Sequence, residues 1–173
     1  TGGIMDPNGQ NKFKGHVRQI AEVFRHNSER LAMPFSIISE QLALQTVFNL
    51  AIGNWDGHLK NYSIVYLRGS GGRPYRVAPS PAYDILPLGA IRQESAYDSG
   101  LHINGKRSNI SPKDVIEEFK AFGAEKEARK AFEIFHDRHD TIRDLYIDNL
   151  SAFGLSGYEQ GIANFLNSKY GFF

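Results

Sequence analysis

The sequence predicts an α+β fold that is mostly helical and contains one small β-hairpin. Three segments, beginning near Val17, Pro34 and Glu125, have apolar residues at the three- and four-residue spacing of amphipathic helices. Two short segments, 62–67 and 75–78, are rich in β-branched and aromatic residues, and a Gly-rich stretch separates them. With 173 residues, 41% of them hydrophobic, the chain is long enough for one domain with a substantial core.

Composition limits the classes of function. Twenty Lys and Arg against nineteen Asp and Glu give a net charge of +1, so charge predicts no nucleic-acid partner. Cys is absent, which excludes disulfides and thiolate metal sites. No apolar run approaches the roughly 18 residues of a membrane span, and no signal-peptide pattern precedes Met5. We therefore expect a cytoplasmic location without membrane contact, and a chain that has been cut or processed.

The first half of the chain contains signals for two helices. Residues 1–12 are polar and rich in Gly and Asn, which predicts a flexible lead-in. A first helix is expected over 17–27. A second is expected over 34–53, because Pro is favoured in a first turn and Gly just after a last turn. After the hairpin, the polar stretch 95–109 predicts an extended loop.

The second half contains further helix signals. Ser111 is a suitable N-cap, Pro112 suits the first helical position, and Gly123 can end the helix. One long helix or two are expected over 125–150, and a last helix over 158–166.

A cluster of polar residues follows directly on the second predicted helix. Residues 53–61 have the sequence Gly-Asn-Trp-Asp-Gly-His-Leu-Lys-Asn, and Tyr83-Asp84 follows the hairpin. Protein kinases use an Asp that accepts the substrate hydroxyl proton, then an Asn and a later Asp that hold metal ions. Asp56, Asn61 and Asp84 have that order. Because the hairpin folds the chain back, we expect Asp84 to lie close to Asp56.

The chemistry of phosphoryl transfer suggests a role for each of these side chains. Asp56 would be the catalytic base, and Asn61 and Asp84 would offer Mg²⁺ the oxygen ligands that it prefers. Lys60 is well placed to contact the γ-phosphate of ATP. His58 either holds the loop by hydrogen bonds or touches phosphate, and the residues leave both open.

Other polar and aromatic residues have structural explanations. Trp55 is expected to pack under the loop. The Gly cluster at 69–72 predicts a turn, because no helix follows it to bind phosphate. Lys12 and Lys14 lie in the polar segment before the first helix, so no strand lysine is available for the α- and β-phosphates.

These motifs resemble the HipA family of bacterial serine/threonine kinase toxins. The resemblance covers most of the chain and is carried by Ile52-Gly53-Asn54-x-Asp56-Gly57-His58-x-Lys60-Asn61-x-Ser63, by Pro79 and by Tyr83-Asp84-Ile85. It implies a protein kinase-like carboxy-terminal lobe over 13–173, with the metal site carried by the hairpin. It also implies Asp56 as the base, Asn61 and Asp84 as magnesium ligands, and His58, Lys60 and Tyr83 beside the ATP phosphates. The Asp-x-His-x-x-Asn order also resembles phosphoinositide-type lipid kinases, which favours a phosphate-facing His58.

The resemblance carries further expectations about activity and partners. It implies ATP- and magnesium-dependent phosphorylation of a protein such as an aminoacyl-tRNA synthetase, with the growth arrest associated with persistence. It also implies a small DNA-binding antitoxin of the HipB type, through which alone DNA would be contacted. The amino-terminal lobe, with its phosphate loop and ATP-pairing lysine, is expected to be absent from these residues.

Two other classes of function stay open. One is a catalytically incomplete kinase-like module that binds a partner. The other is a metallophosphoesterase, because Gly-Asn-x-Asp-x-His is similar to the metal motifs of those enzymes. It ranks lower, since two-metal sites need paired histidines and only His58 is near the acids.

Overall fold

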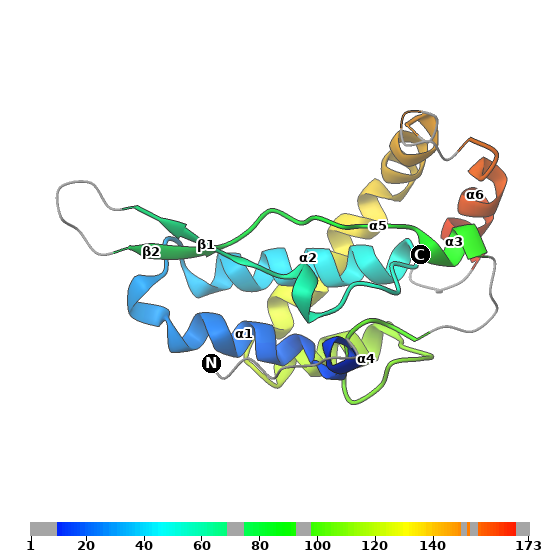
Figure 1. Ribbon diagram of the computed structural model, residues 1–173. Helices are drawn as coiled ribbons and strands as arrows, with labels where there is room; N and C mark the ends of the chain where they lie inside the picture. Colours follow the sequence, from blue (N-terminus) through cyan, green and yellow to red (C-terminus); the bar gives the residue numbers. More distant parts are fainter. Residues whose placement is uncertain (1–9, 69–74, 93–97, 150–151, 153–155, 169–173) are drawn as a thin grey trace.

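The computed structural model describes residues 10–68, 75–92, 98–149, 152 and 156–168 (Figure 1). The expected α+β composition, mostly helical with one small hairpin, is confirmed. The helices are α1 (Val17–His26), α2 (Phe35–Ala51), α3 (Leu88–Arg92), α4 (Pro112–Lys120), α5 (Glu125–Asp148) and α6 (Glu159–Ser168). Short 3₁₀ turns are η1 (Gln10–Lys14), η2 (Ser28–Arg30) and η3 (Leu59–Asn61), and the strands are β1 (Ile64–Leu67) and β2 (Arg76–Pro79).

Helix α2 lies at the centre of the hydrophobic core. It packs against α1 and α5, and α4 in turn contacts both of those helices (Figure 1). Leu42 and Val47 on α2 are buried in one cluster with Phe24 of α1, Phe119 of α4 and Phe135 of α5. Removing these side chains from water is the main force that holds the four helices together.

The end of α2 directs the chain into the polar loop. Gly53 adopts a left-handed conformation with φ of 68°. Its N–H donates to the Leu50 carbonyl at 3.2 Å, and the Asn54 N–H donates to the Asn49 carbonyl at 2.8 Å. This pair of bonds is the Schellman motif, in which Gly avoids the steric cost of positive φ. The predicted end of the helix at Gly53 is therefore confirmed.

The predicted hairpin is also confirmed. Strands β1 and β2 are antiparallel, with Ile64 opposite Pro79 and Leu67 opposite Arg76. The Ser80 N–H extends the pairing by donating to the Ser63 carbonyl at 2.9 Å. The predicted turn at 69–72 lies outside the described residues. Beyond β2 the chain runs back along α2 toward α3 (Figure 1).

Helix α4 has the predicted start. The Ser111 hydroxyl accepts from the Asp114 N–H at 3.3 Å, while the Asp114 carboxylate accepts from the Ser111 N–H at 2.9 Å. This reciprocal capping box satisfies two backbone donors that the first turn of a helix leaves unpaired. Gly123, with φ of 72°, follows the helix as predicted. Residues from Glu125 to Asp148 then form one helix rather than two.

Part of the stretch expected to be an extended loop folds as a tight turn. Ile103 and Lys106 exchange backbone hydrogen bonds of 2.8 and 3.0 Å, and Asn104 and Gly105 between them have φ of 50° and 75°. These values fit a type I′ turn, for which Asn-Gly is a favoured dipeptide. The buried Glu118 carboxylate holds this turn by accepting from the Asn104 N–H at 2.8 Å.

The same Glu118 carboxylate also binds the start of α1. It accepts from the Arg18 N–H at 3.1 Å, so α4 fixes both α1 and the turn near Asn104.

At the other end of the molecule, α6 packs on α3 and α5 (Figure 1). Of the helices in the described ranges, none is long and apolar enough to cross a membrane. Residues 1–9 of the expected lead-in lie outside the described residues, and residues 10–12 belong to η1.

Candidate active site

Asp56 and His58 lie in the loop between α2 and η3. The Asp56 side chain is 41% exposed, whereas the His58 side chain is 7% exposed. His58 Nε2 lies 3.6 Å from Asp56 Oδ1, and the His58 N–H donates to the Asp56 carbonyl at 2.7 Å. The loop therefore presents a carboxylate to solvent with a buried imidazole beside it.

Asn61 and Asp84 meet although 23 residues separate them. Asn61 Nδ2 donates to Asp84 Oδ2 at 2.6 Å, and Asn61 Oδ1 accepts from the His58 N–H at 2.9 Å. Asn61 is buried, whereas Asp84 is exposed. Asp84 has φ of 56°, in the left-handed region that few residues other than Gly enter. The amide thus connects the loop of Asp56 to the segment that follows the hairpin.

Tyr83 fastens that segment to the loop. Its hydroxyl donates to the Lys60 carbonyl at 2.7 Å and lies 2.6 Å from the Ser63 hydroxyl. The Lys60 side chain is exposed. These bonds keep Asp84, the neighbour of Tyr83, beside Asn61. Tyr83 thus positions Asp84 through its hydrogen bond to the Lys60 backbone carbonyl, a contact that the motif alone does not predict.

A further cation lies at the site. Lys12 Nζ is 3.2 Å from Asp56 Oδ1, across 44 residues of sequence. The neighbouring Phe13 ring packs edge-on against the His58 imidazole, with ring centroids 5.4 Å apart. The sequence interpretation gave Lys12 no role at the site. No local pattern marks this lysine, because the contact depends on how η1 crosses the loop.

The electrostatic environment keeps His58 neutral near pH 7. Burial and the nearby Lys12 ammonium lower the pKa of His58 below its usual value. The Asp56 and Asp84 carboxylates act in the opposite direction, and they do not overcome the first two effects. A neutral imidazole next to Asp56 can donate or accept one hydrogen bond at each nitrogen, depending on its tautomer.

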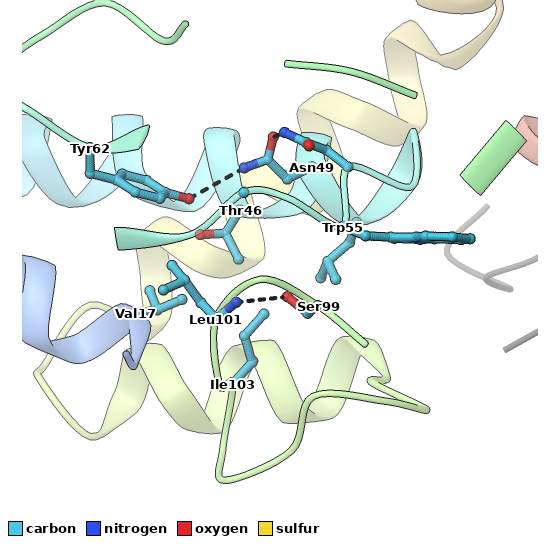
Figure 2. A pocket seen from close by; sticks show the side chains of 11 residues that line it. Val17, Thr46, Asn49, Trp55, Tyr62, Ser99, Leu101 and Ile103 are labelled. Atoms are coloured by element: carbon cyan, nitrogen blue, oxygen red, sulfur yellow. Dashed lines mark hydrogen bonds between the residues drawn. The ribbon is translucent and has the colours of Figure 1, made fainter. Parts of the chain in front are cut away.

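A layer of buried polar side chains supports the loop from α2. Asn49 Nδ2 donates to the Tyr62 hydroxyl at 3.3 Å, and Asn54 Nδ2 donates to Asn49 Oδ1 at 3.1 Å (Figure 2). Desolvation raises the pKa of the Tyr62 phenol, so its hydroxyl stays protonated. Trp55 is buried, as expected for a packing residue, and its ring extends away from this layer in Figure 2.

Gly100 packs directly on the backbone of the loop. A Cβ atom placed on Gly100 would lie 2.6 Å from both the carbonyl carbon and the carbonyl oxygen of Gly57. Only Gly permits this approach. The segment containing Gly100 therefore packs against and supports the loop, a role that its sequence did not indicate.

An apolar groove adjoins the site. It is bordered by α2, by the return segment from Pro79 to Ile85 and by α5, and it reaches Asn61 and Ser63. Its walls include Leu44 and Phe48 of α2. The groove therefore meets the site at Asn61 and Ser63.

The donor chemistry at Asp84 and Asn61 fits a hard divalent cation. Mg²⁺ typically binds one or two protein carboxylates and takes its other ligands from substrate phosphates and water. Asp84 offers an exposed carboxylate, which the Asn61 amide nitrogen faces. The Asn61 amide oxygen, the atom that could bind a cation, accepts from the His58 N–H and has a second lone pair. Within the described ranges, no group of three or more His, Cys, Asp or Glu side chains is arranged to hold a metal.

Comparison with known proteins identifies the family. The family model described as "HipA-like C-terminal domain" matches residues 3–145, a range that includes every site residue named above. No curated protein matches the chain. Because the matched range exceeds half of the 173 residues, the chain belongs to the HipA-like C-terminal domain family.

Proposed function

We propose that this chain is the catalytic lobe of an ATP- and magnesium-dependent serine/threonine protein kinase. Asp56 is the catalytic base, Asn61 and Asp84 hold magnesium, and His58, Lys60 and Tyr83 border the ATP phosphates. The expected kinase-like architecture is part of this proposal. It is supported by family membership and by the geometry of the loop.

One observation carries the proposal. The Asn61 amide contacts the Asp84 carboxylate at 2.6 Å, and the loop just before Asn61 exposes the Asp56 carboxylate. A base and a pair of oxygen ligands held by separate segments are what phosphoryl transfer requires, because the protein mainly positions groups and neutralises charge.

The reaction follows from these positions. The oxygen of a substrate Ser or Thr hydroxyl bonds to the γ-phosphorus while the bond from that phosphorus to the bridging oxygen of ADP breaks. The hydroxyl proton goes to the Asp56 carboxylate, which is exposed enough to receive it. Magnesium, when bound, would neutralise charge on the phosphate oxygens. Asn61 and Asp84 would hold it, and His58 orients Asp56 from its buried side.

Family membership also motivates proposals about partners. The substrate would be a protein connected with translation, such as an aminoacyl-tRNA synthetase, so that phosphorylation arrests growth. A DNA-binding antitoxin of the HipB type would restrain the kinase. Both proposals come from the family and not from a surface of this chain.

The decisive experiment measures phosphate transfer from γ-labelled ATP by the full-length gene product, with and without Mg²⁺. Asp56→Asn keeps the shape of the side chain and removes its basicity, so we expect transfer to fall by about 10²- to 10⁴-fold. Asp137→Asn, on the exposed face of α5, makes the same chemical change away from the site and should keep full activity. Unchanged transfer in Asp56→Asn would remove the role given to Asp56. A wild-type protein that binds magnesium-ATP but transfers nothing would instead support the binding-module alternative.

A further inference from the structure

The Lys12–Asp56 ion pair places a cationic group against the carboxylate of the proposed base. Lys12 Nζ and His58 Nε2 lie 3.2 and 3.6 Å from the same oxygen, Asp56 Oδ1. Among the described residues, the other oxygen, Oδ2, makes no hydrogen bond. Since 41% of the Asp56 side chain is exposed, a substrate hydroxyl can reach this carboxylate, and Oδ2 is the oxygen left without a hydrogen bond.

Lys12 is held at this position by its own segment. Phe13 packs on His58, and the Arg107 guanidinium lies over the Phe13 ring, 5.5 Å from its centroid. The Gly15 carbonyl accepts from the His102 N–H at 2.8 Å. A Cβ on Gly15 would collide with the Leu59 side chain, so the backbone just after η1 passes very close to η3. These contacts therefore hold in place the backbone that carries Lys12.

Contacts of His102 connect the segment of Lys12 to the hydrophobic core. The His16 and His102 rings are stacked with centroids 4.8 Å apart, and the Val17 N–H donates to the His102 carbonyl at 3.3 Å. Val17 is the first residue of α1 and is buried. The segment between Lys12 and α1 is thus fixed at both ends.

We propose that Lys12 is a positioning residue that holds Oδ1 of Asp56 and so turns Oδ2 toward the substrate hydroxyl. This inference depends on the proposed kinase function. A carboxylate on an exposed loop can rotate about its side-chain bonds, and its basic oxygen is useful only when it lies within hydrogen-bond reach of the proton. Two groups on Oδ1, one from η1 and one from the loop, remove that freedom.

The energetics of the ion pair suit this role better than a structural one. Lys12 and Asp56 are both partly exposed, and partly exposed ion pairs contribute little to folding stability. The motif suggested Lys60 as the lysine that faces phosphate, and its side chain is exposed. Lys12 is the lysine whose ammonium contacts the Asp56 carboxylate.

The test measures kcat and the KM for ATP in the full-length gene product, for Lys12→Ala, Lys12→Arg and Lys14→Ala. Lys14 is an exposed lysine in the same turn and serves as the matched control. For Lys12→Ala we expect kcat to fall about 10- to 100-fold, the range for a misplaced catalytic group, with KM for ATP and the melting temperature almost unchanged. Lys12→Arg should recover most of the loss, because it restores a cation that reaches Oδ1. Lys14→Ala should match wild type.

A double variant separates positioning from other roles. If Lys12 acts through Asp56, Lys12→Ala should cause little further loss in the Asp56→Asn background. A full additional loss there, a rise in KM alone, an increase in kcat, or unchanged kcat in Lys12→Ala would each overturn the inference while leaving the kinase assignment intact. A wild-type protein without phosphate transfer would overturn the proposed function, and this inference with it.

Discussion

Asn61 shows how one buried side chain can organise an exposed site. Its amide oxygen accepts from the His58 backbone and its amide nitrogen donates to Asp84. Both ends of the amide are therefore used, and the side chain cannot turn without breaking one of these bonds. The loop and the segment after the hairpin consequently keep a fixed relation at the proposed metal position.

Replacing Asp84 tests that position. Asp84→Asn removes the carboxylate charge and keeps the volume, so magnesium and the phosphate charge that it neutralises would be poorly held. We expect kcat/KM for ATP to fall by roughly 100-fold or more. Because Asp84 is exposed, its replacement should leave the melting temperature within a few degrees of wild type.

Two measurements accompany this variant. Asp137→Asn is again the control, and raising the Mg²⁺ concentration should partly restore Asp84→Asn if the lost interaction is metal binding. Wild-type kinetics in Asp84→Asn at low Mg²⁺ would contradict the metal role given to this residue.

Individual site residues differ in how well the sequence alone identifies them. Their types and order predict roles for Asp56, Asn61 and Asp84, and the structure brings Asn61 and Asp84 together. The sequence does not predict a role for Lys12 or Gly100, because each contributes through contacts with residues far along the chain. A lysine in a polar segment and a glycine in a loop have ordinary local explanations, and only the tertiary path distinguishes them.

Secondary-structure elements were predictable where a local signal decided them. Ser111 and Pro112 marked the start of α4, and Gly53 and Gly123 marked helix ends, because caps depend on a few adjacent residues. The type I′ turn at 104–105 was missed although Asn-Gly is a strong signal for it. Flanking polar residues concealed the short hairpin, whose apolar positions are buried only by tertiary packing.

The start of α4 should make folding stability depend on pH. Asp114 is buried, which by itself would raise its pKa, but hydrogen bonds from Lys106, Ser111 and Asn104 hold the pKa of that carboxyl well below its usual value. The stabilisation is therefore complete above the unfolded-state value of about 3.9 and is lost as the pH falls below it. Asp114→Asn should lower the free energy of unfolding at pH 7 by about 1 to 3 kcal/mol.

Urea unfolding between pH 7 and pH 2 provides the measurement. The difference between wild type and Asp114→Asn should shrink as the pH falls from about 5 toward 2, because the unfolded wild-type chain takes up a proton at this carboxyl in that range while the folded protein keeps it ionised. Asp137→Asn, an exposed control, should follow the wild-type curve at every pH. A difference that stays constant with pH would show that shape, and not ionisation, accounts for the effect.

At the scale of the whole molecule, the site is built where four separate segments cross. Residues from η1, the loop after α2, the segment after β2 and the turn region near Gly100 all meet there. The helical core made by α1, α2, α4 and α5 fixes their relative positions. Amphipathic periodicity predicts that such a core exists, but it does not specify which loops the packing brings together.

A substitution at Gly100, which packs on Gly57, tests whether the meeting of these four segments matters. Gly100→Ala would place a methyl group against the backbone of Gly57 in the Asp56 loop, where no flexible side chain can move aside. We expect a loss of about 1 to 3 kcal/mol in the free energy of unfolding, as for other overpacking changes. Displacement of Asp56, next to Gly57, should also lower kcat.

Ser108→Ala is a suitable control for this variant, because Ser108 is an exposed residue of the same region. It should leave both stability and kcat at wild-type values. If Gly100→Ala proved as stable and as active as Ser108→Ala, the support of the loop by this segment would not matter for function.

The left-handed backbone at Asp84 has a consequence for the evolution of this protein. At φ of 56°, glycine would suit the backbone better than aspartate, so stability and activity favour different residues at the same position. A library selected only for heat resistance should accumulate Asp84→Gly, and a library selected for phosphate transfer should retain Asp84. If the second library retains Asp84 although the backbone favours glycine there, this position is under selection for activity.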